Sequence, residues 1–280
     1  MAVTENVTGY AFLMNLGFDP EPDVQALELE TRYSGDYDRE PAYRCQRMTL
    51  GPPKPWQAWR GTFPLLPTSA ATEHLAQTWA IAIRAYPDKF RHTERENRIT
   101  EFLWSEVAKS SLSARLTGKW TYEDPNVIFD AKRKGVIKRV RSDITYLSDK
   151  GDVTLFLVYE FKKLRDNDTS RKTYQDEDGM MRFVNGYYSV AQPLAAVVGM
   201  IIGEPANCID ALKRSLIVPG VRSSLFMVPD NSQYVRTPST TLVPVAQFDT
   251  EHRRPTDQAP GGNGTTTLAH IFFALPKLEG

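Results

Sequence analysis

The chain has 280 residues, with 34 Lys and Arg against 34 Asp and Glu, and 41% of its residues are hydrophobic. A chain of this length buries about 75% of its extended surface on folding, so the composition excludes overall disorder. The longest apolar run, 194–202, is far shorter than the roughly 18 residues of a membrane span, and the first residues do not resemble a secretory signal. We therefore expect a cytoplasmic protein that does not contact a membrane.

The two cysteines, Cys45 and Cys208, are too far apart in sequence to indicate a disulfide framework or a zinc site. Charge is distributed unevenly: residues 1–41 hold nine acids and two bases, whereas residues 126–172 hold twelve bases and seven acids. Local positive charge can attract a polyanion in a chain that is neutral overall. The proline-rich stretch 51–55 predicts a break between an acidic N-terminal arm, 1–55, and a main domain, 56–280.

Two helices are expected at the start of the main domain. Thr68–Ala85 contains Leu75, Trp79, Ile81 and Ile83, which we expect to pack on the core. Arg91–Leu116 repeats apolar residues every three to five positions, which is typical of a helix with one buried stripe. That stripe is made of Ile99, Leu103, Val107 and Leu112, and Gly118 is expected to end the helix.

The periodicity then changes to two and predicts a hairpin, with strands over Lys138–Ser148 and Val153–Lys163 joined by 149–152. Both faces of the second strand begin apolar, which is typical of a central strand. Residues 182–202 are expected to form a helix that kinks at Pro193. Later strands are expected over 215–218, 225–228, 241–248 and 266–275. The order of elements predicts an α/β domain with a central mixed sheet flanked by helices.

Two acidic residues and a lysine are expected to share one face of the hairpin. A four-residue loop would place Ser148 opposite Val153 and Asp143 opposite Val158, so that Asp143 and Glu160 become diagonal neighbours roughly 7 Å apart or less. A register slip of one residue would move Asp143 to the other face. In this arrangement the two carboxylates can hold Mg²⁺, which polarises a scissile phosphate, while Lys162 positions or deprotonates the attacking water. The alternative is an ordinary salt bridge at a strand end.

The same residues carry a resemblance to a known family. Ser142-Asp143-Ile144 and Glu160-Phe161-Lys162, with sixteen residues between Asp143 and Glu160 and the second motif at the end of an apolar strand, resemble the signature of the PD-(D/E)XK, or restriction-endonuclease-like, nucleases. Ser142 stands where the family name has a proline, a position that bears no metal. The resemblance covers about 93–203 and extends loosely to the C-terminal end. It implies a restriction-endonuclease-like core within about 93–230.

The resemblance also implies the site. Asp143, Glu160 and the Phe161 carbonyl are expected to bind Mg²⁺, or Mn²⁺ in its place, and Lys162 to act in catalysis. A helix glutamate completes the metal shell, with Glu96 preferred and Glu94 and Glu101 left open. The basic side chains expected to contact nucleic acid, DNA rather than RNA, are Lys138, Arg139, Arg141 and Lys163. The runs 180–188, 251–253 and 268–273 resemble patterns in a subset of bacterial members.

The other candidate residues indicate a function less strongly. His252 is expected in a polar loop, where it is exposed or contacts phosphate, and His270 in the core. Gln175 occupies a spacing at which some related nucleases place a glutamine, although 167–172 reads as a flexible loop. Tyr187 and Tyr188 are expected in the core, with base stacking as the alternative. No G-x-S-x-G or Cys–His pattern indicates acyl transfer.

Two functions follow from the sequence. The first is a metal-dependent endo- or exonuclease, for which the resemblance suggests a restriction or phage-defence effector that acts as a homodimer or with a protein partner. The second is a non-catalytic nucleic-acid-binding or scaffold subunit that retains the nuclease fold, with the acidic arm docking on a partner or covering the basic surface.

Overall fold

In the computed structural model of the chain, placement is described for residues 63–111, 114, 116–130, 135–148, 155–188, 192–254 and 264–276. The chain divides into two units, Met1–Gln46 and Arg47–Gly280, and all of these residues belong to the second. The predicted acidic arm, 1–55, therefore lies outside the described residues, as do Cys45 and the predicted loop 149–152.

The described part of the chain forms an α/β domain built on a seven-stranded mixed sheet, in the order β1-β2-β3-β4-β7-β6-β5. Strands β3, β4 and β7 are parallel at its centre, and the outer pairs are antiparallel. The elements in chain order are α4 (Leu65–Ala85), η1 (Pro87–Phe90), α5 (Glu96–Ser110), β1 (Lys119–Asp130), β2 (Gly135–Ser148), β3 (Leu155–Leu164), α6 (Asp168–Gln175), α7 (Met181–Val184), β4 (Leu194–Ile201), α8 (Pro205–Leu216), α9 (Pro219–Ser224), β5 (Met227–Val228), β6 (Phe248–Arg253) and β7 (Thr265–Ala274).

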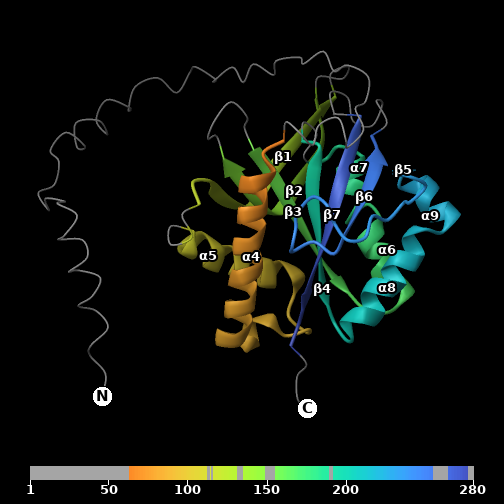
Figure 1. Cartoon of the computed structure of the whole chain (residues 1–280). Coiled ribbons are helices and arrows are strands. Elements are labelled where there is room, and N and C mark those ends of the chain that lie inside the picture. Colours follow the sequence, from red (N-terminus) through yellow and green to blue (C-terminus); the bar gives the residue numbers. More distant parts are fainter. Residues whose placement is uncertain are drawn as a thin grey trace, which may run out of the picture. The chain divides into compact units, whose positions relative to one another are not determined.

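Helices cover both faces of the sheet. Figure 1 shows α4 and α5 on one side and α6, α8 and α9 on the other. The alternation of β3 explains the two layers, because Leu157, Tyr159 and Phe161 join the core under α4 and α5, whereas Val158 and Leu164 join the core under α6 and α8. β3 is consequently covered on both faces, as its apolar sequence predicted.

The two N-terminal helices lie where the sequence predicted them, but their boundaries differ in part from the prediction. Leu75 and Trp79 are buried, whereas Ile81 on the same helix is 67% exposed. α5 begins at Glu96, five residues later than predicted, because a 3-10 turn and a loop precede it. Its stripe of Ile99, Leu103 and Val107 is fully buried.

Gly118 lies beyond the end of α5 and has a different role from the predicted helix terminator. Its N–H donates to the Tyr146 hydroxyl over 3.0 Å. A side chain at this position would overlap the Tyr146 ring and the Leu147 carbonyl, so the close approach of the two segments requires glycine.

The hairpin is present, but its register differs from the prediction by two residues. Ser148 lies opposite Leu155 instead of Val153, and Ile144 lies opposite Tyr159. A shift of two residues keeps every side chain on its predicted face, because strand side chains alternate with a period of two. Continuing the same register by one pair brings Asp143 directly opposite Glu160.

The predicted kinked helix over 182–202 is wrong. This segment contains the short helix α7 and then the strand β4, of which every residue is buried. A continuous apolar run is typical of a parallel strand covered on both faces, and periodicity alone does not separate it from a buried helix. Pro193 stands just before the strand, and its carbonyl accepts from the Thr267 N–H at 2.8 Å.

Several shorter predictions need correction. β1 was not predicted from the sequence, and the start of α6 was expected to be a flexible loop. Residues 215–218 end α8 and are not a strand, while 241–248 is irregular up to the start of β6. The strands predicted at 225–228 and 266–275 are confirmed as β5 and β7. No described helix combines the length and apolar character needed to cross a bilayer.

Candidate functional site

The candidate site lies where β2 and β3 separate. Their ladder ends at the pair Ile144 and Tyr159. One step further, the Phe161 N–H donates to the carboxylate Oδ2 of Asp143 over 2.8 Å. A side chain thus replaces the backbone acceptor that a continued ladder would supply. The strands open at this point, and the space between them receives side chains from other elements.

Lys162 is at the centre of the site. Its Nζ lies 2.8 Å from Oε1 of Glu160 and 2.8 Å from Oε1 of Glu96. It also donates to the Phe161 carbonyl over 2.7 Å. Three of the four groups predicted to hold a metal therefore surround this ammonium, whose side chain is 7% exposed. The ion pairs of Lys162 are made within the predicted residue set and not with unrelated partners.

Glu96 enters the site because it is the first residue of α5. Its Oε2 accepts the backbone N–H of Lys163 over 2.9 Å, so the carboxylate bridges the main chain of β3 and the ammonium of Lys162. An acidic residue in the first turn also suits the positive end of the helix dipole. Of the glutamates left open by the sequence, Glu101 pairs with Arg98, and Glu94 accepts the N–H of Arg95.

Glu160 is fully buried and contacts a second cation, Arg182 of α7. The Arg182 guanidinium lies 3.2 Å from Oε1 of Glu160, the same oxygen that Lys162 contacts. The other oxygen, Oε2, is buried and has no hydrogen-bond partner. Buried carboxylate oxygens are normally paired, so this atom is available for a further ligand.

Tyr188 supports Arg182 from the segment after α7. Its hydroxyl accepts from the Arg182 guanidinium and donates to the carbonyl of Arg141 on β2. The side chain is fully buried, as the sequence predicted, but its hydroxyl faces the site. The sequence pattern indicated no site role for Arg182, and for Tyr188 it left base stacking only as the alternative to a core position. The available signal was their presence in the run 180–188, which the family resemblance had marked.

Burial and neighbouring charges shift the pKa values of Asp143, Glu160 and Lys162. Burial, reinforced for Glu160 by Asp143, raises the pKa of Asp143 to about 6 and that of Glu160 to about 8. Burial alone would lower the pKa of Lys162, but attraction by Glu160, Asp143 and Glu96 outweighs it and raises the pKa above its ordinary value. Lys162 therefore remains an ammonium at neutral pH and donates hydrogen bonds. The expectation that it helps to deprotonate water does not fit this state.

The residues predicted to bind nucleic acid divide into three cases. Arg141 is exposed, and its guanidinium pairs with Glu123 at 2.8 Å. Lys163 instead donates to the carbonyls of His92, over 2.8 Å, and Glu94, and so fastens the loop before α5 to β3. The side chains of Lys138 and Arg139 lie outside what the structure describes.

The remaining candidates lie apart from these residues. Gln175 bonds to Ser215 over 3.0 Å. His252 is fully buried in β6, not exposed in a loop, and burial lowers its pKa to about 4. Its Nε2 and the Nε2 of His270 both contact the Thr250 hydroxyl, and His270 Nδ1 contacts Tyr174. His270 is a hydrogen-bonded core histidine, as predicted.

The described residues include no group of three or more His, Cys, Asp or Glu side chains arranged to hold a metal ion. The carboxylates of Glu96 and Glu160 are directed at Lys162, which accounts for this result. Two features nevertheless fit a hard cation: the donors are all oxygens, and Oε2 of Glu160 is buried without a partner. Asp143, Glu160, Glu96 and the Phe161 carbonyl are the groups that would hold Mg²⁺.

Comparisons with protein-family models, with curated proteins and with solved structures found no match to this chain. The class of protein that fold and site define is an α/β domain in which two carboxylates and a backbone carbonyl surround a buried lysine, with a third carboxylate bound to the main chain beside them.

Proposed function

We propose that the protein is a metal-dependent nuclease that hydrolyses phosphodiester bonds of nucleic acid, DNA in preference to RNA. One observation carries the proposal: the Lys162 ammonium lies 2.8 Å from Glu160, two residues before it on β3, and 2.8 Å from Glu96, next to the point where the β2–β3 ladder gives way to the Asp143 carboxylate. The mixed sheet flanked by helices is the kind of core that the restriction-endonuclease resemblance implies, and it supports the proposal coarsely.

In this proposal each residue has a defined task. Asp143 accepts the Phe161 N–H and so fixes the main chain of β3 at the residue whose carbonyl accepts from Lys162. Bound to the surrounding oxygens, Mg²⁺ would polarise the scissile phosphate and neutralise the charge that develops on it. Lys162, as an ammonium, orients the attacking water or a phosphate oxygen by hydrogen bonding. Arg182, 23% exposed at the side chain, adds a second positive charge beside Glu160.

The test is an assay of plasmid DNA, single-stranded DNA and RNA with Mg²⁺, Mn²⁺ or EDTA. Asp143→Asn, Glu96→Gln and Lys162→Ala are each expected to reduce cleavage by a factor of 10² or more, the range typical of a group that acts on the transition state. Glu101→Gln, on the same helix as Glu96 but paired with Arg98 at the surface, is the matched control. Cleavage that survives both Asp143→Asn and Lys162→Ala would remove the assignment.

A non-catalytic nucleic-acid-binding or scaffold subunit is the second candidate. The observation in its favour is that two cations, Lys162 and Arg182, already neutralise one oxygen of Glu160. A protein that binds oligonucleotides with equal affinity in Mg²⁺ and EDTA, and cleaves none of the three substrates, would be of this kind.

A further inference from the structure

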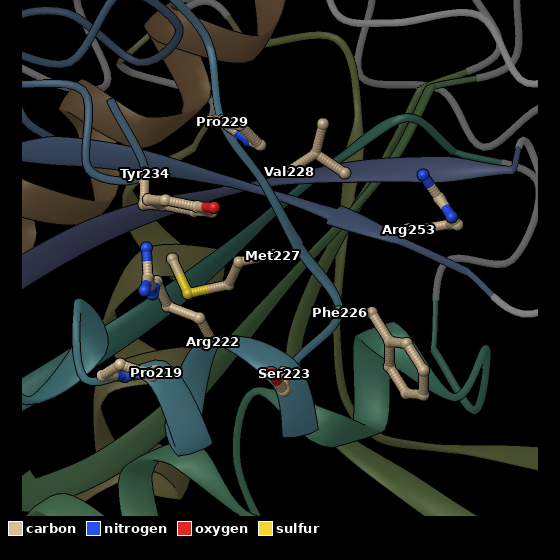
Figure 2. A pocket seen from close by; sticks show the side chains of 9 residues that line it. All are labelled: Pro219, Arg222, Ser223, Phe226, Met227, Val228, Pro229, Tyr234 and Arg253. Carbon is tan, nitrogen blue, oxygen red and sulfur yellow. The ribbon is translucent and has the colours of Figure 1, made fainter. Parts of the chain in front are cut away.

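A shallow pocket of about 290 Å³ lies at the β5 edge of the sheet. Its lining comes from α9, from β5 and the residues that follow, and from the end of β6 (Figure 2). β5 and the candidate site on β3 are four strand spacings apart, which is about 19 Å across the sheet. The pocket is therefore separate from the site described above.

The charged groups of the pocket are both arginines, Arg222 and Arg253, and no carboxylate is among the lining residues. The Arg222 guanidinium lies 4.3 Å from the centroid of the Tyr234 ring, and its Nε is buried without a hydrogen-bond partner. Arg253 is exposed, and none of the ion pairs in the described part of the chain includes it. Within the described part of the chain, the pocket therefore presents two positive charges without an ion pair.

An aromatic side chain stands beside the second arginine. Phe226 is 37% exposed, and its φ of 48° is in the left-handed region, which is costly for a bulky residue. Its carbonyl accepts the Arg253 N–H over 2.8 Å. Figure 2 shows Arg222 and Tyr234 on one side of the β5 segment, and Arg253 and Phe226 on the other. One guanidinium–ring contact, between Arg222 and Tyr234, thus lies on one side of this edge, and an exposed arginine and an exposed ring whose side chains do not contact each other lie on the other.

These features select one class of ligand. A guanidinium matches the geometry of a phosphate group, and an exposed aromatic ring stacks on any base that is not already stacked in a duplex. Five lining residues are exposed, namely Pro219, Ser223, Phe226, Pro229 and Arg253. Sites for small molecules usually enclose most of the ligand surface, which this open surface does not do. An extended chain lying across the edge fits better.

We propose that this pocket binds a single-stranded segment of nucleic acid, with phosphates at Arg222 and Arg253 and an unpaired base on Phe226. The inference rests on the proposed function and adds a second contact with the same polymer, far from the bond that is cut. It requires no metal and no chemical step.

The experiment measures fluorescence anisotropy of a labelled single-stranded DNA of about twenty nucleotides, in EDTA and over a series of KCl concentrations. The double variant Arg222→Gln/Arg253→Gln is expected to bind at least tenfold more weakly. Its plot of log affinity against log salt should be less steep by roughly 0.7 for each lost phosphate contact. Phe226→Ala should weaken binding about fivefold or more with the salt slope unchanged, because stacking releases no counterions.

Arg84→Gln is the matched control, since Arg84 is an exposed arginine at the end of α4, on the opposite face of the sheet. Arg222→Lys retains the charge and is expected to recover the salt slope. Thermal melting of each variant separates lost binding from lost folding. Equal affinity and equal salt slope in the folded double variant and in wild type would overturn the proposal. The proposal would also be overturned if a free mononucleotide bound saturably and displaced the oligonucleotide.

The result of this binding experiment does not depend on the result of the cleavage assay. A protein that binds single strands through these arginines but cuts nothing would retain this inference and lose the proposed function. A protein that cleaves, and whose double variant binds single strands as wild type does, would show the reverse.

Discussion

The ammonium of Lys162 lies 2.8 Å from Oε1 of Glu96, and this ion pair joins the end of β3 to the first residue of α5. The pair is 66 residues apart in sequence. Because Lys162 also contacts Glu160 and the Phe161 carbonyl, it takes up the oxygens that would bind a divalent cation. A metal ion at these groups would therefore compete with the ammonium.

Lys162→Met is expected to increase the affinity for Mn²⁺ severalfold while cleavage is lost, because removal of a positive charge frees the carboxylates for the metal. Binding is measured by calorimetry or by the paramagnetic resonance signal of Mn²⁺, without substrate. Lys172→Met, on the exposed surface of α6, is the control. Weaker Mn²⁺ binding in the Lys162 variant would show that the oxygens do not form the metal site.

Tyr188→Phe is expected to reduce cleavage about tenfold and stability by about 1 kcal/mol, since it removes a hydroxyl that bonds to Arg182 and to the Arg141 carbonyl. The rate is compared with that of Tyr86→Phe, a substitution at a half-exposed tyrosine after α4. If stability falls and the rate stays constant, Tyr188 acts only in folding and does not position Arg182.

The raised pKa of Asp143 predicts the pH dependence of stability in the metal-free protein. Because burial raises this pKa to about 6, against an ordinary value of 3.8, the folded state holds a proton that the unfolded state loses. The stabilisation is complete below about pH 4 and is lost as the pH rises through 6, which amounts to about 3 kcal/mol.

Asp143→Asn should therefore gain stability relative to wild type between pH 4 and pH 7, measured by urea unfolding in EDTA. Asp210→Asn, at an exposed position on α8, should show no such trend. A stability difference that does not change with pH would contradict the assigned burial effect.

The lowered pKa of His252 predicts a pH dependence of stability opposite to that of Asp143. Burial lowers its pKa to about 4, so the folded state keeps a neutral imidazole where the unfolded chain binds a proton. The stabilisation is complete above about pH 6.5 and is lost as the pH falls through 4, again by about 3 kcal/mol. His252→Gln retains hydrogen-bonding groups but cannot titrate, so its stability should decline less than that of wild type on acidification. A parallel decline in both proteins would exclude this histidine as the cause.

The sequence predicted secondary structure most accurately where the pattern of apolar residues was local. The stripe of α5 and the alternation along β3 have periods that only one kind of element satisfies, and both elements were found. The register error in the hairpin had no effect on which side chains share a face, because it was a shift of two residues. The error at β4 arose where the sequence is uniformly apolar and so carries no period.

The sequence was sufficient to place Glu160 and Lys162 on one face of β3, because the alternation along a strand is fixed by covalent geometry. Whether Asp143 shares that face depends on the register between β2 and β3, which the folded chain supplies. The fold also selects which glutamate of the predicted helix reaches Lys162, pairs the Lys163 ammonium with backbone carbonyls, and brings Arg182 and Tyr188 beside Glu160. These choices depend on how α5 and α7 pack against the sheet. Packing brings together residues distant in the chain, and no local period records it.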